Sequence, residues 1–382
     1  MKEEFHIKVN HEVLVWARES IAISKNQASE KTGISFRRLA QLEQGERQPS
    51  LEELKEFSKQ YKRTVATLLL SQPPDEKPLP SDRRTIDSRE LDKFHEKTIM
   101  AVRKARALAQ SFVELRQELG IEISKLSLSA SITQQPQSVA TRVRQYLNLN
   151  AVRQITNINQ ALDAYTEKIE SLGIAVFQLS LTHDRVRGFS ITDDVIPIIG
   201  IKRGGEPTTA KIFTLFHELG HILLNEGGMC DLSEKTNIEI EKWCNAFSAE
   251  VLIPANDLLQ MEIVVNRVRQ GEKVWPKKDL VILGNYFHVG PLAILRSLLE
   301  NQLTTLNYYR DRHQAWNKPQ FGRSAHPEGR NVAKETIKEK GRTYISLAFL
   351  AFDKNRIDLK DLSDFLGIKL SYIQKTRQLL NA

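Results

Sequence analysis

Three residues with chemically reactive side chains interrupt an apolar run in the middle of the chain. His217, Glu218 and His221 lie within FTLFHELGHILL, residues 213–224. If this run is a helix, residues four apart return to one face, so both imidazoles can point at a single metal ion. H-E-x-x-H on a helix is the pattern in which two His bind Zn²⁺ and the Glu takes a proton from the attacking water. The alternative is a helix with two hydrogen-bonded core histidines and an exposed Glu.

A catalytic zinc needs a third protein ligand, and this ligand should lie downstream. Residues 237–254, NIEIEKWCNAFSAEVLIP, show the apolar period of a second helix that Pro254 ends. Glu239, Glu241 and Glu250 lie on this helix. Their spacing alone does not select one of them.

Four segments resemble the ImmA/IrrE metallopeptidases: RGFSI, IFTLFHELGHILL, CD and EKWCNAFSAEVLIP. In that family the second motif begins with the ligand Glu four residues before an Asn or Asp, so the resemblance implies Glu241. Asn245 then falls one helical turn later, where it can hydrogen-bond a ligating imidazole and fix its tautomer. Arg187 and Gly188 match the RGF motif, but the sequence offers no physical reason to place them in the site.

The two cysteines, Cys230 and Cys244, are too few for a disulfide framework. Cys230 follows His221 by nine residues and so could approach the metal. Two His and one Glu already complete a catalytic ligand set, which favours Cys230 as an ordinary, partly buried thiol.

The first 70 residues predict a small all-α domain. Residues 26–32, Gly33 and residues 35–44 have the length and turn of a helix-turn-helix. The segment resembles the XRE-type (Cro/repressor-like) domains in its LxxLExGxxxPSLxxL pattern, made by Leu39, Leu42, Glu43, Gly45, Pro49, Ser50, Leu51 and Leu54.

Whether this domain binds duplex DNA depends on the exposed face of its second helix. Arg37, Arg38 and Gln41 are the candidate contacts, whereas Phe36 would more naturally pack. Residues 1–70 hold 12 Lys and Arg against 10 Asp and Glu, a low charge for a domain that must displace counterions. DNA binding therefore stands beside a second hypothesis, in which the helices form a homodimer or dock a partner.

The rest of the chain predicts one larger core and a basic tail. SQPPDEKPLPSDRRT, residues 71–85, has the Pro and charge content of a linker, and IAVFQLSL, VRGFSIT and VIPIIGIK predict a small sheet beside the metal helices. We therefore expect an α+β, mainly helical fold. Its parts are a helix-turn-helix domain at 1–70, a linker at 71–87, a zincin-like metallopeptidase core with a small sheet at 88–260 and a C-terminal helical region at 261–382.

The C-terminal region holds 21 Lys and Arg against 12 Asp and Glu. Residues 277–309 and 344–380 both have the rhythm of a helix-turn-helix, with Gly367 at a turn between two short helices. Neither segment shows convincing base-reading residues. They resemble the helical regions that follow the peptidase motif in longer family members.

Composition excludes the membrane classes. The chain is 41% hydrophobic and 27% charged, no run approaches the length of a membrane span, and MKEEFHIKVN lacks the apolar stretch of a signal peptide. We expect a cytoplasmic protein with no membrane partner.

The resemblance implies a zinc-dependent endopeptidase that cleaves a cytoplasmic transcriptional repressor at one site. Such a substrate is often itself an XRE-type protein, and its cleavage relieves repression in stress, mobile-element or defence regulation. The alternative is a non-proteolytic DNA-binding regulator or antitoxin-like protein whose metal site is structural or a sensor. Glu218 argues against that alternative, because a purely structural site needs no general base.

Overall fold

The structure is a computed structural model, which describes residues 6–76, 96–123, 126–181, 186–192, 194–225, 228–229, 235–316 and 331–381. The chain divides into two compact units, one of residues 1–79 and 85–100 and the other of residues 80–84 and 101–382. Cys230 lies outside the described residues, as does most of the expected linker.

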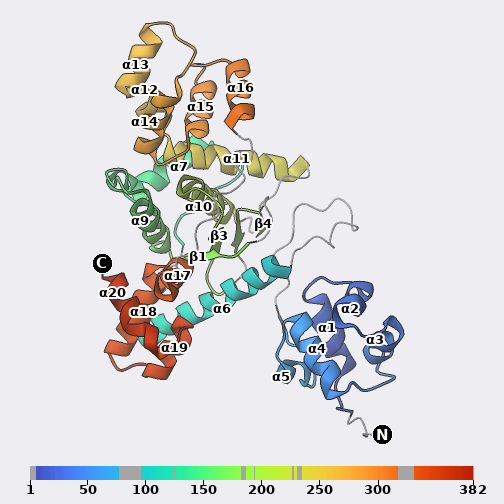
Figure 1. The fold of residues 1–382 in the computed structure, drawn as a ribbon. Coiled ribbons are helices and arrows are strands. Elements are labelled where there is room, and N and C mark those ends of the chain that lie inside the picture. The colour runs from blue at the N-terminus through green and yellow to red at the C-terminus, as the bar shows by residue number, and fades with distance from the viewer. Residues whose placement is uncertain are drawn as a thin grey trace. The chain divides into compact units, whose positions relative to one another are not determined.

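The N-terminal unit is built from short helices whose first turns are capped by side chains. They are α1 (His11–Glu19), α2 (Lys25–Thr32), α3 (Phe36–Glu43), α4 (Leu51–Tyr61) and α5 (Val65–Leu68) (Figure 1). An Asn, Ser or Thr before each helix accepts a backbone N–H, which satisfies a donor that the helix leaves unpaired. Leu39, Leu54 and Phe57 are among the buried residues of the core. The expected all-α helix-turn-helix domain is confirmed.

The second unit is mainly helical around a small sheet. Its earlier helices are α6 (Glu96–Glu118), which begins in the first unit, α7 (Pro136–Tyr146), α8 (Leu149–Val152), α9 (Ile158–Glu170), α10 (Thr208–Leu223) and α11 (Lys235–Leu252). The later helices are α12 (Ala255–Gln260), α13 (Glu262–Arg269), α14 (Lys277–Phe287), α15 (Pro291–Glu300), α16 (Leu306–Trp316), α17 (Val332–Lys340), α18 (Arg342–Asp353), α19 (Leu359–Leu366), the 3₁₀ turn η2 (Leu370–Tyr372) and α20 (Ile373–Leu380).

The sheet has the strand order β1-β3-β2-β4. Its strands are β1 (Ala175–Leu179), β2 (Gly188–Ile191), β3 (Ile198–Lys202) and β4 (Gly228–Met229). Strand β3 pairs parallel with β1 and antiparallel with β2, and β2 pairs antiparallel with β4. The three segments expected to form strands do so, and the mainly helical α+β fold is confirmed.

Helix α10 lies in the core against α11, α9 and the sheet. Gly220 permits the close approach of α10 and α11, because a Cβ at this position would lie 3.1 Å from Cys244 Sγ and 3.2 Å from the Phe247 ring. The Trp243 indole on α11 stacks on the Phe247 ring and donates a 2.7 Å hydrogen bond to the Gln134 carbonyl. These contacts fix the position of α11 beside α10.

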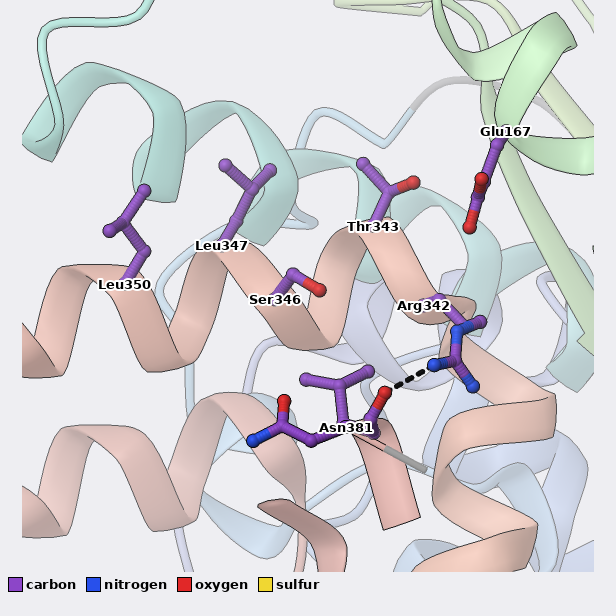
Figure 2. Close-up of a pocket in the computed structure, with 8 residues that line it drawn as sticks. Glu167, Arg342, Thr343, Ser346, Leu347, Leu350 and Asn381 are labelled. Atoms are coloured by element: carbon purple, nitrogen blue, oxygen red, sulfur yellow. Dashed lines mark hydrogen bonds between the residues drawn. The ribbon is translucent and has the colours of Figure 1, made fainter. Parts of the chain in front are cut away.

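The C-terminal helices α17–α20 form a bundle next to β1 and α9. A groove of about 460 Å³ lies between α9 and this bundle, and Figure 2 shows Arg342 reaching toward the last helix, where its guanidinium donates to the Leu380 carbonyl. The groove is lined by Glu167, Arg342, Thr343, Ser346, Leu347, Leu350, Leu380 and Asn381.

Candidate metal centre

The structure brings His217 and His221 of α10 together with Glu241 of α11. His217 Nε2 lies 3.1 Å from Glu241 Oε2, His221 Nε2 lies 3.2 Å from Glu241 Oε1, and the two Nε2 atoms are 3.2 Å apart. All three side chains are buried. The predicted His-His-Glu set therefore converges on one point from two helices.

The distances and the chemistry of this set fit a tetrahedral metal ion. Ligand nitrogen and oxygen atoms about 2.0–2.2 Å from a zinc ion lie about 3.3 Å from one another in tetrahedral geometry. Here the two imidazole Nε2 atoms are 3.2 Å apart, and each lies 3.1–3.2 Å from one of the two carboxylate oxygens of Glu241. Neutral imidazole nitrogens and carboxylate oxygens all offer lone pairs, so a cation bound between them would balance the buried negative charge.

Electrostatics within the cluster point the same way. Burial raises the pKa of Glu241, but its hydrogen bonds and charge interactions with the two histidines outweigh burial and hold the pKa at about 2. Burial lowers the pKa of His217, and the hydrogen bond to Glu241 together with the charge of Glu218 more than offsets this, so that the pKa is raised. Positive charge at this point, carried by a protonated imidazole or by a metal ion, therefore stabilises the buried carboxylate.

Glu218 is fully buried, with none of its surface exposed. Its carboxylate lies against β2 at Gly188, where an added Cβ would stand 2.7 Å from Glu218 Oε1 and 2.7 Å from Thr214 Cγ2. Any side chain at position 188 would therefore displace the carboxylate or Thr214. This is the physical reason for the RGF glycine that the sequence did not reveal, although a glycine inside a strand is itself a signal of close approach.

The other residues of α11 do not share the position of Glu241. Glu239 is exposed. Glu250 is half-buried, its carboxylate accepts the Ala255 N–H at 3.3 Å, and burial raises its pKa. Asn245 lies close enough to raise the pKa of His217, yet among the described residues His217 Nδ1 has no hydrogen-bond partner of normal geometry.

The N-terminal candidates for DNA contact divide into two kinds. Arg37 is exposed and Gln41 half-exposed on α3. Arg38 is not available in the same way, because its guanidinium donates to both oxygens of Glu53, at 2.8 and 2.9 Å, and to the Gln48 carbonyl. Phe36 was expected to pack and is instead 51% exposed, since it stands at the outward-facing start of α3.

Comparison with known families accounts for both units. A family model described as a helix-turn-helix matches residues 14–68, and one described as an IrrE N-terminal-like domain, peptidase family M78, matches residues 169–295. Comparison with curated proteins and with solved structures gives no match. Among the described residues, no helix is both long and apolar enough to cross a membrane.

The second match spans α10 and α11, so the buried His-His-Glu group belongs to a domain of a metal-dependent peptidase family. The first spans α1 to α5 and supports DNA binding. The chain is thus a fusion of an XRE-type helix-turn-helix domain with an ImmA/IrrE-like metallopeptidase domain.

Proposed function

We propose that this chain is a zinc-dependent endopeptidase in which His217, His221 and Glu241 hold the metal and Glu218 is the general base. The observation that carries the proposal is the convergence of three buried ligand atoms beside a fully buried carboxylate. Two imidazoles and one carboxylate are a donor set that suits catalytic zinc and leaves a fourth position open.

Zinc held by His217, His221 and Glu241 would supply Lewis acidity, lowering the pKa of a water and polarising a peptide carbonyl. Glu218 accepts the proton of the attacking water and returns it to the leaving amine. Gly188 leaves the space that the Glu218 carboxylate occupies. Asn245, which lies close to His217, would hold its imidazole in one tautomer through a hydrogen bond to Nδ1.

The substrate that we propose is a cytoplasmic transcriptional repressor, itself of the XRE type, as the resemblance to the ImmA/IrrE metallopeptidases implies. A helix-turn-helix domain fused to a peptidase can act in two ways. Arg37 and Gln41, which are exposed to different degrees on α3, can dock on duplex DNA and bring the peptidase to a repressor at its operator. The same domain can instead pair with the similar domain of the repressor or with a second copy of this chain.

The competing function is a non-proteolytic DNA-binding regulator or antitoxin-like protein with a structural or sensing metal. The helix-turn-helix domain supports DNA binding in both cases, so it does not separate them. The buried Glu218 favours the peptidase, because a carboxylate held at the metal without ligating it has a use in proton transfer and none in a structural site.

The deciding experiment compares newly formed protein N-termini in cells that express the wild type or Glu218→Gln. A terminus that appears only with the wild type names both the substrate and the cleaved bond. Its absence under several stresses, in protein that holds stoichiometric zinc, would reject the peptidase in favour of the regulator.

A further inference from the structure

The last two helices repeat the helix-turn-helix of the N-terminal unit, 334 residues later in the chain. Helix α2 begins with a reciprocal capping box between Ser24 and Gln27. Helix α19 begins with the same capping box, between Asp358 and Asp361. Both helices are eight residues long.

The turns that follow these helices are also alike. Each helix ends at a left-handed glycine, Gly33 with φ 71° and Gly367 with φ 64°. In each, a serine four residues before the glycine donates its hydroxyl to the carbonyl of the isoleucine after it. These hydrogen bonds are Ser29 to Ile34 at 2.6 Å and Ser363 to Ile368 at 2.7 Å.

The burial of matching positions agrees as well. Matching positions are buried on the inner face of both motifs, and a large apolar residue is exposed where each second helical segment starts. The matching exposed fractions are 0% for Ala28 and Leu362, 1% and 0% for Leu42 and Thr376, and 51% and 55% for Phe36 and Leu370. Within the C-terminal motif, α20 therefore takes the outward-facing position that α3 takes within the N-terminal motif.

The outer face of α20 and its turn carries polar and basic side chains. The exposed residues of this face are Lys369, Ser371, Gln374, Lys375 and Gln378. Lys375 stands at the position that Gln41 holds in α3. Neither Lys369 nor Lys375 makes an ion pair with any residue that the structure describes.

Charge favours nucleic acid as the partner of this face. Residues 331–381 hold ten Lys and Arg against six Asp and Glu, whereas the matched helix-turn-helix segment, residues 14–68, holds ten against seven. The bundle that carries α19 and α20 is thus at least as basic as the matched N-terminal segment, and within it residues 358–380 hold four Lys and Arg against three Asp and Glu.

The inner side of the motif is anchored by the rest of the bundle. Arg342 donates to the Leu380 carbonyl at the end of α20 (Figure 2), and Lys340 donates to the Phe365 carbonyl at the end of α19. Arg377, on the inner side of α20, pairs with Asp353 of α18. None of these anchoring contacts uses the exposed side chains of the outer face.

We propose that α19 and α20 form a second duplex-DNA-binding helix-turn-helix. Helix α20 enters the major groove, where Gln374 and Lys375 in its first turn and Ser371 in the preceding turn η2 face the base edges. Lys369 contacts a phosphate. This surface could not be recognised in the sequence, because apolar and polar residues are mixed along the segment. The fold buries the apolar side chains of the inner face and exposes the polar ones.

The test measures binding of the full chain to a labelled mixed-sequence duplex by fluorescence anisotropy over a range of salt concentrations. One variant is Lys369→Glu/Lys375→Glu, and its control is Lys334→Glu, an exposed lysine on α17 of the same bundle. Both are made in the wild type and in an Arg37→Ala/Gln41→Ala background, which weakens the N-terminal site.

In the Arg37→Ala/Gln41→Ala background we expect the chain to retain salt-dependent binding. The Lys369→Glu/Lys375→Glu change should then lower affinity at least tenfold and reduce the slope of log K against log salt by about two, while Lys334→Glu leaves both unchanged. Loss of all binding in that background, or equal effects of the two charge reversals, would overturn the proposal. Peptidase activity plays no part in this measurement.

Discussion

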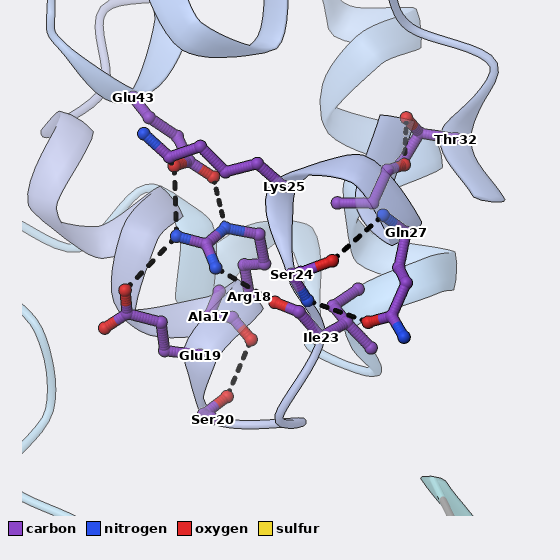
Figure 3. A network of polar contacts seen from close by, with 11 residues as sticks. Ala17, Arg18, Glu19, Ser20, Ile23, Ser24, Lys25, Gln27, Thr32 and Glu43 are labelled. Atoms are coloured by element: carbon purple, nitrogen blue, oxygen red, sulfur yellow. Dashed lines mark hydrogen bonds and ion pairs between the residues drawn. The ribbon is translucent and has the colours of Figure 1, made fainter. Parts of the chain in front are cut away.

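The two units bury charged groups in opposite ways. In the N-terminal unit the Arg18 guanidinium donates to both oxygens of Glu43, at 2.7 and 3.1 Å, and to the Ile23 carbonyl at 2.9 Å, while Lys25 lies 3.4 Å from the same carboxylate (Figure 3). In the peptidase unit, two imidazole nitrogens and a carboxylate face one another.

The first cluster is complete by itself, because donors meet acceptors and, with Glu19 3.2 Å from Arg18, two cations meet two carboxylates. In the second, two imidazoles meet a single carboxylate, and a metal ion bound by all three would let both imidazoles stay neutral as ligands. A buried ionic cluster therefore points to a ligand only when its own members cannot satisfy one another. Substitutions at the two clusters and at other buried groups test that distinction.

Removing a metal ligand should have the largest effect. Glu241→Ala should abolish zinc binding and cleavage, and a thousandfold excess of zinc over its Kd should raise the unfolding free energy of the wild type by about 4 kcal/mol but not that of the variant. Metal content and thermal unfolding with and without zinc measure this. Glu239→Ala, an exposed carboxylate on the same helix, is the matched control and should behave as the wild type. Zinc retained by Glu241→Ala would disprove the ligand assignment.

Glu218→Gln should separate metal binding from catalysis. The amide cannot accept the proton, so kcat/KM should fall by about a hundredfold to ten-thousandfold while zinc stays stoichiometric. Cleavage of the identified substrate and metal analysis check both parts. A variant that still cuts at the wild-type rate would remove Glu218 from the mechanism.

Breaking the Arg18–Glu43 cluster should lower the unfolding free energy of the N-terminal unit, and added zinc should not change this loss. Arg18→Met leaves the Glu43 carboxylate buried with Lys25 alone, and we expect the N-terminal unit to lose about 3–5 kcal/mol. Hydrogen exchange of the α1 to α4 amides measures this locally. Replacing both partners, Arg18→Met/Glu43→Met, should recover most of the loss, and failure to recover would show that the pair does more than neutralise itself.

Glu170 provides an intermediate case, a buried carboxylate with neither metal nor guanidinium bound to it. Burial raises its pKa to about 8, although the Thr343 hydroxyl donates to it. Because the folded state holds the proton more tightly than the unfolded state, stability is complete below about pH 4.5 and falls as pH rises toward 8, by a few kcal/mol. Unfolding in urea across this pH range should show the decline in the wild type and a flatter profile in Glu170→Gln. Equal profiles would contradict the raised pKa.

The smallest predicted effect comes from Gly188→Ala. The added methyl displaces Glu218 without touching the ligands, so cleavage should fall by about tenfold to a hundredfold with zinc retained. Gly204→Ala is the matched control, because nothing lies within 4 Å of its new Cβ. Gly200→Ala collides with the Phe189 ring and controls for general damage to the sheet. If Gly188→Ala matches Gly204→Ala, the space at position 188 does not position the base.

Much of this architecture could be predicted because it is local. The spacing of His217, Glu218 and His221 places them on neighbouring positions of one helix whatever the rest of the chain does. The N-caps and the left-handed Gly33 likewise mark helix starts and turns through contacts within a few residues. The helix-turn-helix and the two metal helices follow from such signals.

The remainder depends on segments that meet only in the folded chain. Glu241 rather than Glu250 faces the histidines because of how α11 packs on α10, and Arg38 turns to Glu53 because α4 passes beside α3. Gly188 acquires its importance from Glu218, thirty residues away in the chain. The sequence by itself therefore determined the helices and the placement of His217, Glu218 and His221 on one of them. Tertiary structure alone decided which charges meet and which face solvent, because burial and pairing are properties of contacts between distant segments.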